Sequence, residues 1–422
     1  MIKKNRNNPK RIVAKFGGSS LADGESILKA VKAVAKAVQK GNQVVVVVSA
    51  MGKTTDALIG IINQSSEGKV TPNLLDDILS MGERTSARLF AAALKAQGVE
   101  TRCFDPTDAD WPIITDSSFT DAWPKLDECL PRARRHILPL LEKGITPVVA
   151  GFLGKTRNGQ ITTLGRGGSD TTAFIIGRAI QADEVVLVTD VDGILSGDPK
   201  IVHQPKRINQ ITVDSLAGLA DSGTKFIHFK ALKYKDDSFD VRLINHQLGK
   251  LDCEGTVIVG SLPSELNVSL AHNEPVMMIT IVGEHVSETP EIIQDIAGIA
   301  KQFSKPILGS SSNYNSIVLY MPQKSPKQLI EALHSIILKY KETFAIAIRE
   351  NLALLKIKGV GLEEKPGLIG RIAEPLRANH LNIFGIFTIT SSVLVLVDWN
   401  DEKKAIDLVR KSLEDKVRGK EV

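Results

Sequence analysis

The sequence predicts an α/β protein: an αβα sandwich with a mostly parallel sheet, followed by two smaller ferredoxin-like modules. In the first part of the chain, short apolar segments alternate with helical segments, which is the rhythm of parallel-sheet proteins. The segment 43–49 is apolar except at its ends, as expected of a parallel strand buried on both faces. From about residue 263, a β-α-β-β-α-β pattern recurs loosely, and this is the element order of ferredoxin-like modules.

Hydrophobic periodicity places the individual elements. Helix 25–40, for example, carries Ile27, Val31, Val34 and Val38 on one side. In the first part, strands are expected at 12–16, 43–49, 99–104, 146–151 and 184–189, and helices at 25–40, 73–97 (interrupted at 81–84), 131–143 and 171–180. In the second part, strands are expected at 276–282, 316–321, 344–349, 353–360, 381–390 and 392–399, and helices at 290–303, 326–340, 366–378 and 401–414.

These elements suggest the following domain organisation. Residues 1–10 are basic and polar and are expected to form a disordered tail. A large domain should cover 11–262, and two modules should cover 263–350 and 351–422. Because the repeat is weak, a single irregular α+β domain after residue 262 remains an alternative to two modules.

Composition excludes several classes of function. The net charge is +5, but lysines and glutamates are interspersed, without a basic stripe and interleaved aromatics, so we expect no nucleic-acid partner. The longest strongly apolar run, 44–48, is too short to cross a membrane. Cys103, Cys129 and Cys253 have neither the spacing of a metal site nor the even number of a disulfide framework. We therefore expect a cytoplasmic protein without a metal site of its own.

Two glycine-rich strings carry the most specific chemistry. Each follows a strand or turn and leads into a helix: Lys15-Phe16-Gly17-Gly18-Ser19-Ser20 and Gly165-Arg166-Gly167-Gly168-Ser169-Asp170. Glycine lets a ligand approach the backbone closely, and a helix N-terminus carries partial positive charge, so each string could cradle an anion. The first string has neither Walker nor Rossmann spacing. A lysine in one string and an Arg/Asp pair in the other suggest phosphoryl transfer.

The polar groups of the second string have both functional and structural interpretations. Arg166 offers a planar fork that suits a carboxylate, and Asp170 could orient a lysine, a substrate ammonium or a metal-bound water. Ser169 and Asp170 could equally cap the helix that follows them. Both roles can coexist at one helix start.

Charged and hydroxyl side chains elsewhere could complete the same site. Glu83 falls where the pattern of its helix turns inward, and a buried carboxylate needs a cationic partner, either a protein arginine or a bound ammonium. Ser49 and Thr55 could bind substrate or cap the next helix. Thr189 and Asp190 end a buried strand, where ligands bind in open α/β sheets, although such a turn is often only structural.

Taken together, these strings resemble the aspartokinases of the amino acid kinase superfamily, and the similarity covers nearly the whole chain. The matching segments occur in the order of that family. They are Lys15–Ser20, Ser49-Ala50-Met51, Gly82-Glu83-Arg84, Thr162–Thr172, Thr189–Gly193, Asp198-Pro199-Lys200 and Ser222-Gly223-Thr224-Lys225. The resemblance also implies that the two C-terminal modules are ACT domains, the first of them divergent.

The resemblance implies the reaction of ATP with L-aspartate to give 4-phospho-L-aspartate and ADP, the first step of lysine, threonine and methionine biosynthesis, with Mg²⁺ held mainly by phosphate oxygens and water. The implied catalytic residues are Lys15, Asp170, Gly17 and Gly18. The implied substrate-binding residues are Ser49, Thr55, Glu83, Arg166 and Ser169. The implied ATP-binding residues are Lys15, Gly17, Gly18, Ser19, Thr189, Asp190, Lys200, Lys225 and Phe226.

Some positions depart from the family pattern. Leu195 replaces a common tyrosine and Lys200 an arginine, which leaves the nucleotide contacts of that loop open. The first module has Gly283–Ser287 where a Pro-Gly is usual, whereas the second keeps Lys365-Pro366-Gly367. Such modules commonly bind an amino acid, here lysine or threonine, and assemble a homo-oligomer. Alternatively, they serve only to dimerise the enzyme.

Two other functions compete with this interpretation. A kinase for glutamate or acetylglutamate usually lacks the Gly-Glu-Arg helix, so Glu83 argues against it. A catalytically silent amino-acid sensor would be expected to have lost Lys15, Arg166 or Asp170, and all three are present.

Overall fold

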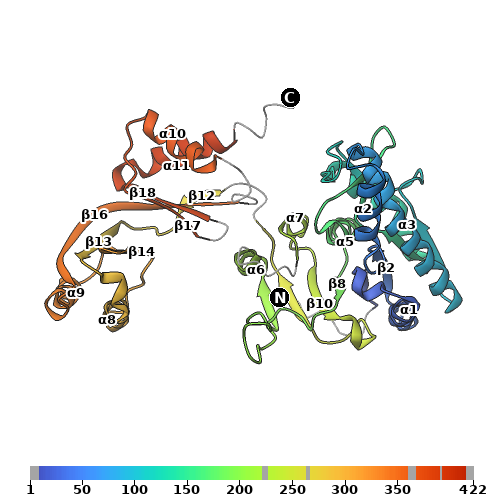
Figure 1. The fold of residues 1–422 in the computed structure, drawn as a ribbon, viewed down its shortest axis with the longest axis horizontal. Helices are drawn as coiled ribbons and strands as arrows, with labels where there is room; N and C mark the ends of the chain where they lie inside the picture. Colours follow the sequence, from blue (N-terminus) through green and yellow to red (C-terminus); the bar gives the residue numbers. More distant parts are fainter. Residues whose placement is uncertain (1–8, 221–226, 263–266, 360–366, 390–391, 415–422) are drawn as a thin grey trace. The chain divides into compact units, whose positions relative to one another are not determined.

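The computed structural model describes residues 9–220, 227–262, 267–359, 367–389 and 392–414. The chain divides into two compact units, Met1–Leu262 and Pro263–Val422. Within the described residues, no helix is long and apolar enough to cross a membrane. Each unit contains its own sheet and its own helices (Figure 1).

The described part of the first unit contains an eight-stranded sheet that is parallel in its centre. Its order is β3 (Thr101–Phe104), β5 (Thr146–Ala150), β2 (Gln43–Val48), β1 (Arg11–Phe16), β8 (Glu184–Thr189), β10 (Asp240–Asn245), β11 (Thr256–Val259) and β9 (Gln210–Thr212). Every pairing is parallel except that of β10 with β11. The predicted mostly parallel sheet is therefore confirmed.

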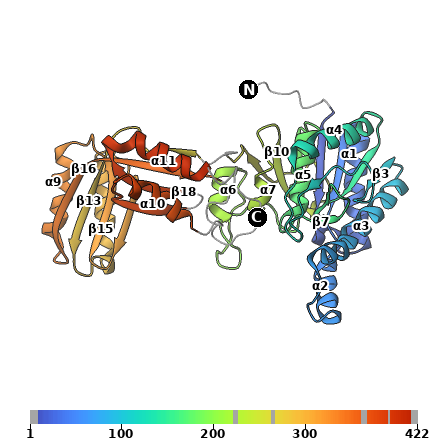
Figure 2. The same ribbon diagram turned by 90° about the horizontal axis from the view of Figure 1, so that it is seen from above.

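Helices cover both faces of this sheet, as the run of buried valines in β2 requires. The helices are α1 (Gly24–Gln39), α2 (Thr54–Ser65), α3 (Pro72–Ala96), α4 (Leu126–Glu142), α5 (Gly168–Ala179), α6 (Val213–Ala220) and α7 (Phe229–Leu232). The pair α1 and α3 and the pair α4 and α5 each pack together and against β2. The helix α2 packs on α3 and extends from the body of the unit (Figure 2).

The first unit also contains a small second sheet, which the sequence did not predict. It consists of β4 (Ile114–Thr115), β6 (Leu153–Thr156) and β7 (Ile161–Thr163). Two short 3₁₀ turns, η1 (Gly18–Leu21) and η2 (His246–Leu248), follow β1 and β10. The first glycine-rich string runs from the end of β1 into η1, and the second lies between the end of β7 and the start of α5.

Two predictions about helices in this unit were wrong. The helix α3 continues through 81–84 without the predicted interruption. Gly82 does not break the helix; it allows close packing, since a Cβ there would lie 2.9 Å from the Cβ of Ala50. The helix α4 begins at Leu126, before the predicted start at 131, and contains Pro131. Proline in an early turn removes one intrahelical hydrogen bond, and the packing of α4 against α5 and the sheet tolerates this loss.

The described part of the second unit contains an antiparallel sheet with four helices. The sheet order is β14 (Gly309–Asn313), β15 (Ser316–Pro322), β13 (Val276–Gly283), β16 (Thr343–Lys358), β18 (Ser392–Asp398) and β17 (Gly385–Ile389), and β12 (Asn267–Leu270) also pairs with β16. The helices are α8 (Pro290–Gln302), α9 (Lys327–Lys339), α10 (Leu368–Ala378) and α11 (Glu402–Glu414). The short turns η3 (Val286–Glu288) and η4 (Trp399–Asp401) complete the unit.

The long strand β16 connects the two halves of this unit. Two separate strands were predicted, at 344–349 and 353–360; this was wrong, because β16 continues past Asn351 (φ +61°) with a shift of register instead of a loop. Its second half pairs with β12, and Val268 of β12 lies in the same core cluster as Ile372 of α10. A segment assigned to the range 263–350 therefore contributes to the core of the later module.

All four helices pack on one face of this sheet. Ile279 of β13 packs with α8 and α9, and Leu355 of β16 packs with α10 and α11. Alternate residues such as Leu354 point to the other face and form a third cluster with Tyr320. The ring of Tyr320 stacks on that of Phe387 at 5.4 Å, so side chains from strands far apart in the sheet order meet inside a curled sheet.

Candidate active site

The site lies at the carboxyl ends of the central parallel strands, where open α/β sheets bind ligands. The backbone continues the strand pairing for one residue beyond the strand ends. Gly17 N–H donates to Val188 O at 3.1 Å, Ser49 N–H donates to Phe16 O at 3.1 Å, and Gly151 N–H donates to Val48 O at 2.8 Å. Four loops are therefore fixed side by side.

A cavity of about 640 Å³ opens between these loops, α3 and the start of α5. It brings together eight residues that the sequence assigned to substrate and phosphate handling: Lys15, Gly18, Ser49, Thr55, Glu83, Arg166, Ser169 and Asp170. These residues come from five separate segments of the chain. Their convergence in one cavity is a result of the fold, which the sequence alone could not show.

Lys15 and Asp170 join the two glycine-rich strings. Lys15 Nζ lies 2.7 Å from Asp170 Oδ1, and the two side chains are 16% and 13% exposed. Asp170 lies in the first turn of α5, where a carboxylate interacts favourably with the helix dipole. The ammonium of Lys15 is thus held at the cavity wall, close to a helix N-terminus that also favours anions.

The two glycines after β1 differ in their surroundings. A Cβ on Gly17 would meet only Val188 O at 3.6 Å and Lys15 Nζ at 3.8 Å. A Cβ on Gly18 would lie 3.0 Å from both Ala50 O and Gly52 O. Gly18 is therefore required by the fold, whereas Gly17 keeps open the space beside the lysine.

Glu83 is a buried carboxylate that forms no ion pair with a described residue. Its side chain is 3% exposed, and Ala50 N–H donates to Oε1 at 3.1 Å. Within the described residues, Oε2 has no hydrogen-bond partner. Burial raises the pKa of Glu83 from 4.5 to about 7. The sequence allowed a protein arginine or a bound ammonium as the partner of Glu83, and no arginine of the described residues forms an ion pair with it.

Arg84 points to a different part of the unit. Its Nε donates to Asp105 Oδ2 at 2.9 Å, and Arg88 Nη2 reaches the same oxygen at 2.7 Å. Burial alone would raise the pKa of Asp105, but hydrogen bonds from Arg84 and Thr107 outweigh it and lower this pKa to about 2. Arg84 therefore stabilises the link between α3 and β3.

The loop that carries Arg166 depends on two glycines with positive φ. Gly165 has φ +68° and lies against Asp121, whose Oδ1 would be 2.1 Å from an added Cβ. Gly167 has φ +72°, and an added Cβ would lie 2.5 Å from the Cβ of His228. Only glycine fits both conformation and space at these positions. Arg166 itself is exposed and forms no ion pair with a described residue.

Two serines close one side of the cavity. Ser49 Oγ donates to Ser169 Oγ at 3.0 Å, joining the end of β2 to the first turn of α5. Gly151 permits this approach, since a Cβ there would lie 2.9 Å from the Ser169 side chain. Thr55, in the first turn of α2, lines the cavity.

Lys230 is a buried residue that sequence reasoning missed. Its Nζ donates to Asp121 Oδ1 at 2.6 Å, to Leu164 O at 2.8 Å and to Ala122 O at 3.1 Å. It therefore ties the loop after β4 to the residue that precedes Gly165. A lysine inside the otherwise apolar segment 229–232 was the signal that could have identified it.

Asp76 plays a similar part from α3 and was also missed. It is fully buried and accepts hydrogen bonds from Thr163 N–H at 2.9 Å, Thr163 Oγ1 at 2.7 Å and Thr120 N–H at 2.9 Å. Burial raises the pKa of Asp76 although these hydrogen bonds oppose the change. The back of the cavity is thus fixed by a carboxylate bonded to main chain and hydroxyl groups.

Several residues that the sequence assigned to ATP do not line this cavity. Thr189 Oγ1 donates to Asp190 Oδ1 at 3.0 Å beyond the end of β8. Ser19 lies in η1, and Lys200 lies in an exposed loop, where its N–H donates to Asp198 Oδ1 at 2.9 Å. Lys225 and Phe226 fall outside the described residues.

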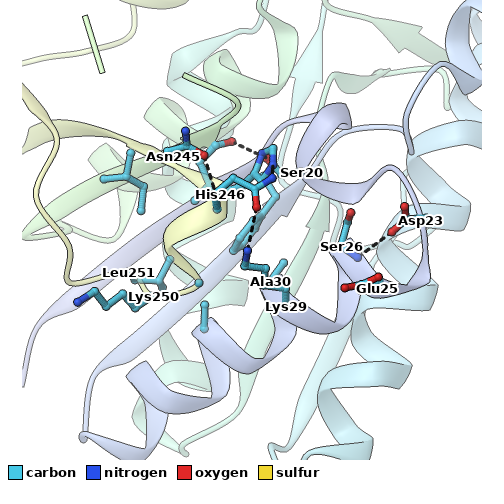
Figure 3. A pocket seen from close by; sticks show the side chains of 16 residues that line it. Ser20, Asp23, Glu25, Ser26, Lys29, Ala30, Asn245, His246, Lys250 and Leu251 are labelled. Atoms are coloured by element: carbon cyan, nitrogen blue, oxygen red, sulfur yellow. Dashed lines mark hydrogen bonds between the residues drawn. The ribbon is translucent and has the colours of Figure 1, made fainter. Parts of the chain in front are cut away.

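A second, smaller cavity of about 160 Å³ lies between α1 and the ends of β8 and β10 (Figure 3). His246 lies beside Ser20 in it, with Nδ1 3.5 Å from Oγ, and Lys29 Nζ donates to Gln247 Oε1 at 3.1 Å. None of the described residues assigned to substrate or nucleotide lines it. The larger cavity is therefore the candidate active site.

Known proteins share both the sequence pattern and the fold. Residues 10–245 match the model of the amino acid kinase family. An aspartokinase from Pseudomonas aeruginosa is 33% identical over 419 residues, which cover 95% of this chain and 96% of that protein.

Solved structures lead to the same family. The aspartate kinase from Synechocystis is 28% identical, with a TM-score of 0.75, over 95% of this chain and 69% of that one. The E. coli aspartokinase III in complex with aspartate and ADP has a TM-score of 0.54 over 95% of this chain and 99% of that one, and at 22% identity it shows the fold alone. The chain therefore belongs to the amino acid kinase family, among its aspartokinases, and its function is that of an aspartate kinase.

Proposed function

We propose that the 640 Å³ cavity is where the γ-phosphoryl group of ATP is transferred to the β-carboxylate of L-aspartate. The observation that carries this proposal is the arrangement around Lys15 and Asp170. An ammonium is held at a helix start, a buried carboxylate lies on α3, and a guanidinium lies on the neighbouring loop; neither of the last two forms an ion pair with a described residue. These groups complement the phosphate, the ammonium and a carboxylate of the reactants.

The chemistry requires alignment more than proton transfer. A carboxylate is already a nucleophile, so the cavity needs no general base, and catalysis reduces to positioning and charge neutralisation. In this proposal Lys15, with the N–H group of Gly18, stabilises the charge on the transferring phosphoryl group. The sequence also implied the N–H of Gly17, but this group donates to Val188 O, so Gly17 contributes only the open space beside Lys15. Asp170 orients Lys15.

The amino acid is held by the remaining groups of the cavity. Arg166 binds one of its carboxylates, and Glu83 accepts hydrogen bonds from its ammonium. Ser49, Thr55 and Ser169 complete the contacts to the substrate. The support for Glu83 in this role is its buried Oε2, which would find its missing partner in the ammonium.

ATP use follows from the family, and its contacts are part of the proposal. We assign the nucleotide to Ser19, which follows β1, and to Thr189, Asp190 and Lys200, which follow β8. The ends of β1 and β8 are paired side by side, next to Lys15. Lys225 and Phe226, which lie outside the described residues, belong to the same assignment. Leu195 and Lys200 are the two positions after β8 that depart from the family pattern.

Mg²⁺ belongs to the proposal as a metal carried by the nucleotide. Among the described residues, no group of three or more His, Cys, Asp or Glu could hold a metal ion. Mg²⁺ is commonly bound by phosphates and water with only one or two carboxylates, and Asp170 is a carboxylate of the cavity that fits this limited part. When bound, Mg²⁺ supplies charge neutralisation at the phosphate oxygens.

The second unit is proposed to be regulatory. We propose that it consists of two ACT domains that bind an end-product amino acid, lysine or threonine, and assemble a homo-oligomer. Its two helix pairs on one curled antiparallel sheet support the domain assignment. A cytoplasmic location is part of the same proposal and agrees with three free cysteines. Calorimetric titration of lysine and of threonine into the protein tests the proposed effector. If neither amino acid binds, the proposed regulation is wrong.

A parallel assay tests the substrate. ADP release is measured with ATP and, separately, L-aspartate, L-glutamate and N-acetyl-L-glutamate. Preference for aspartate is expected. Preference for either of the other two would overturn the assignment and favour the alternative kinases, and turnover with none would favour a silent sensor.

A further inference from the structure

Thr120 has a backbone conformation that its side chain disfavours. Its φ is +71°, and it is the only β-branched residue with positive φ in the described part of the chain. A β-branched residue rarely adopts this conformation, because its side chain crowds the backbone. Such strain persists only where the surrounding structure holds it, and it concentrates at functional sites.

Buried charged groups on both sides hold Thr120 in place. Its N–H donates to Asp76 Oδ2 at 2.9 Å, and Asp76 is itself anchored by two hydrogen bonds to Thr163. The next residue, Asp121, accepts a hydrogen bond from the buried Lys230 at 2.6 Å. The conformation at residue 120 is therefore fixed independently of any ligand.

These constraints place Thr120 on the wall of the active-site cavity. It lines the cavity together with Glu83 and Arg166, and it is exposed. Asp121 lies so close to Gly165 that a Cβ there would be 2.1 Å from Asp121 Oδ1. Thr120 therefore lies beside the loop that contains Gly165 and Arg166. No described residue accepts or donates a hydrogen bond at the Thr120 hydroxyl.

We propose that Thr120 is a further substrate-binding residue, whose hydroxyl donates a hydrogen bond to the amino-acid carboxylate that Arg166 binds. This inference rests on the proposed function of the cavity. A guanidinium on an exposed loop leaves a bound carboxylate free to rotate, whereas a second donor on a rigid neighbouring segment fixes its orientation. The strained backbone aims that donor into the cavity.

Three substitutions separate the hydroxyl from the strain. Thr120→Val keeps the branched shape and removes the hydroxyl, Thr120→Ser keeps the hydroxyl, and Thr120→Gly removes the hydroxyl and relieves the strain. We expect the KM for aspartate to rise about 10-fold or more in Thr120→Val and Thr120→Gly, the size expected for a lost hydrogen bond to a charged group. Thr120→Ser should stay near wild type, and the KM for ATP should not change.

Thermal unfolding shows whether a variant acts through the fold. Thr120→Gly should have a higher midpoint than wild type, because glycine adopts positive φ without crowding. The matched control is Gln181→Gly, at another positive φ in the same unit but outside the cavity. It should leave the KM for aspartate unchanged.

The outcomes distinguish this inference from the proposed function. An unchanged KM for aspartate in Thr120→Val, or in Thr120→Gly if the valine variant does not fold, overturns the role of Thr120. If wild type prefers glutamate or N-acetylglutamate, the proposed substrate is wrong. The role of Thr120 is then tested by the ratio of the KM of Thr120→Val to that of wild type, measured with the preferred amino acid. If calorimetry shows that wild type binds none of the three, both proposals fall.

Discussion

Lys15 Nζ lies 2.7 Å from Asp170 Oδ1, which links the end of β1 to the first turn of α5. The two residues are more than 150 positions apart in the chain, and each belongs to a glycine-rich string that could cradle an anion. Their ion pair places the ammonium at a fixed point of the cavity wall. The phosphoryl-handling role of the first string and the orienting role of the second both depend on this contact.

Replacing Lys15 by alanine should abolish most of the turnover. We expect kcat to fall ~10²-fold or more, since the loss of one preorganised charge-stabilising donor typically costs this much. Steady-state kinetics measure the effect, and circular dichroism checks the fold. The matched control is Lys10→Ala, which removes an exposed lysine just before the other end of β1 and should leave kcat near wild type. A folded Lys15→Ala protein with normal turnover would exclude the role.

The binding of aspartate should depend on pH through Glu83. Because burial raises the pKa of Glu83 to about 7, this carboxyl is largely protonated below that pH and cannot pair with an ammonium. The KM for aspartate should therefore rise as pH falls from 8 to 6. Glu83→Gln should have a high KM that changes little over this range. A wild-type profile that is flat, or identical to that of Glu83→Gln, would contradict the assignment.

The same carboxyl should make folding stability fall as pH rises, whereas aspartate binding improves as pH rises. The folded-state pKa lies above the unfolded value of 4.5, so the native state holds a proton that the unfolded chain has lost between pH 4.5 and 7. This contribution to stability is complete below pH 4.5 and is lost as pH rises to 7. Denaturant unfolding should show that the free energy of unfolding of the wild type falls by on the order of 3 kcal/mol between pH 4.5 and 7 through this group, and that Glu83→Gln lacks this decrease. An equal decline in both proteins would argue against a buried, ionising Glu83.

Alanine at the two glycines after β1 should give different defects. Gly17 has an ordinary extended backbone and room for a methyl group, so Gly17→Ala should keep its thermal stability. Its methyl would occupy the space beside Lys15, and we expect the KM for ATP to rise roughly 10-fold because the phosphate can no longer approach the ammonium closely. Gly18→Ala should lower stability and disturb aspartate binding, because two carbonyl oxygens must move. Equal stability losses in both variants would refute this distinction.

Arg84 should contribute to stability and leave substrate binding unchanged. Arg84→Ala removes a hydrogen-bonded cation from the buried Asp105, and we expect the free energy of unfolding to fall by about 1–3 kcal/mol. Arg88→Ala is the matched comparison, and its loss should be smaller because the Arg88 side chain is 54% exposed. Both KM values should stay near wild type. A large rise in the KM for aspartate in Arg84→Ala would place Arg84 in the site after all.

The sequence predicted the parts of the site that lie in short contiguous strings. Lys15, Arg166 and Asp170 stand beside glycines at strand-to-helix junctions, where the local pattern already indicates anion binding. The parallel sheet was predictable for a similar reason, because a run of valines such as β2 has few alternatives to burial on both faces. That Lys15 and Asp170 would meet required the strand order.

The sequence could not predict residues whose role depends on contacts between distant segments. Asp76 and Lys230 are buried charges that bond to main-chain groups far away in the chain. The apolar neighbours of Lys230 indicate burial, but no local pattern indicates the partners of either residue. The strain at Thr120 comes from a backbone angle that propensities for threonine do not suggest. Gly82 was misread for the same reason, since its contact with Ala50 crosses two elements.

Trapping the product with hydroxylamine tests the central claim most directly. An acyl phosphate on the aspartate side chain reacts with hydroxylamine to give a β-hydroxamate, which forms a coloured complex with ferric ion. Wild-type protein with ATP, Mg²⁺ and L-aspartate should produce this hydroxamate, and folded Lys15→Ala should produce ~10²-fold less. Absence of hydroxamate with the wild-type protein, or equal production by both proteins, would contradict the account.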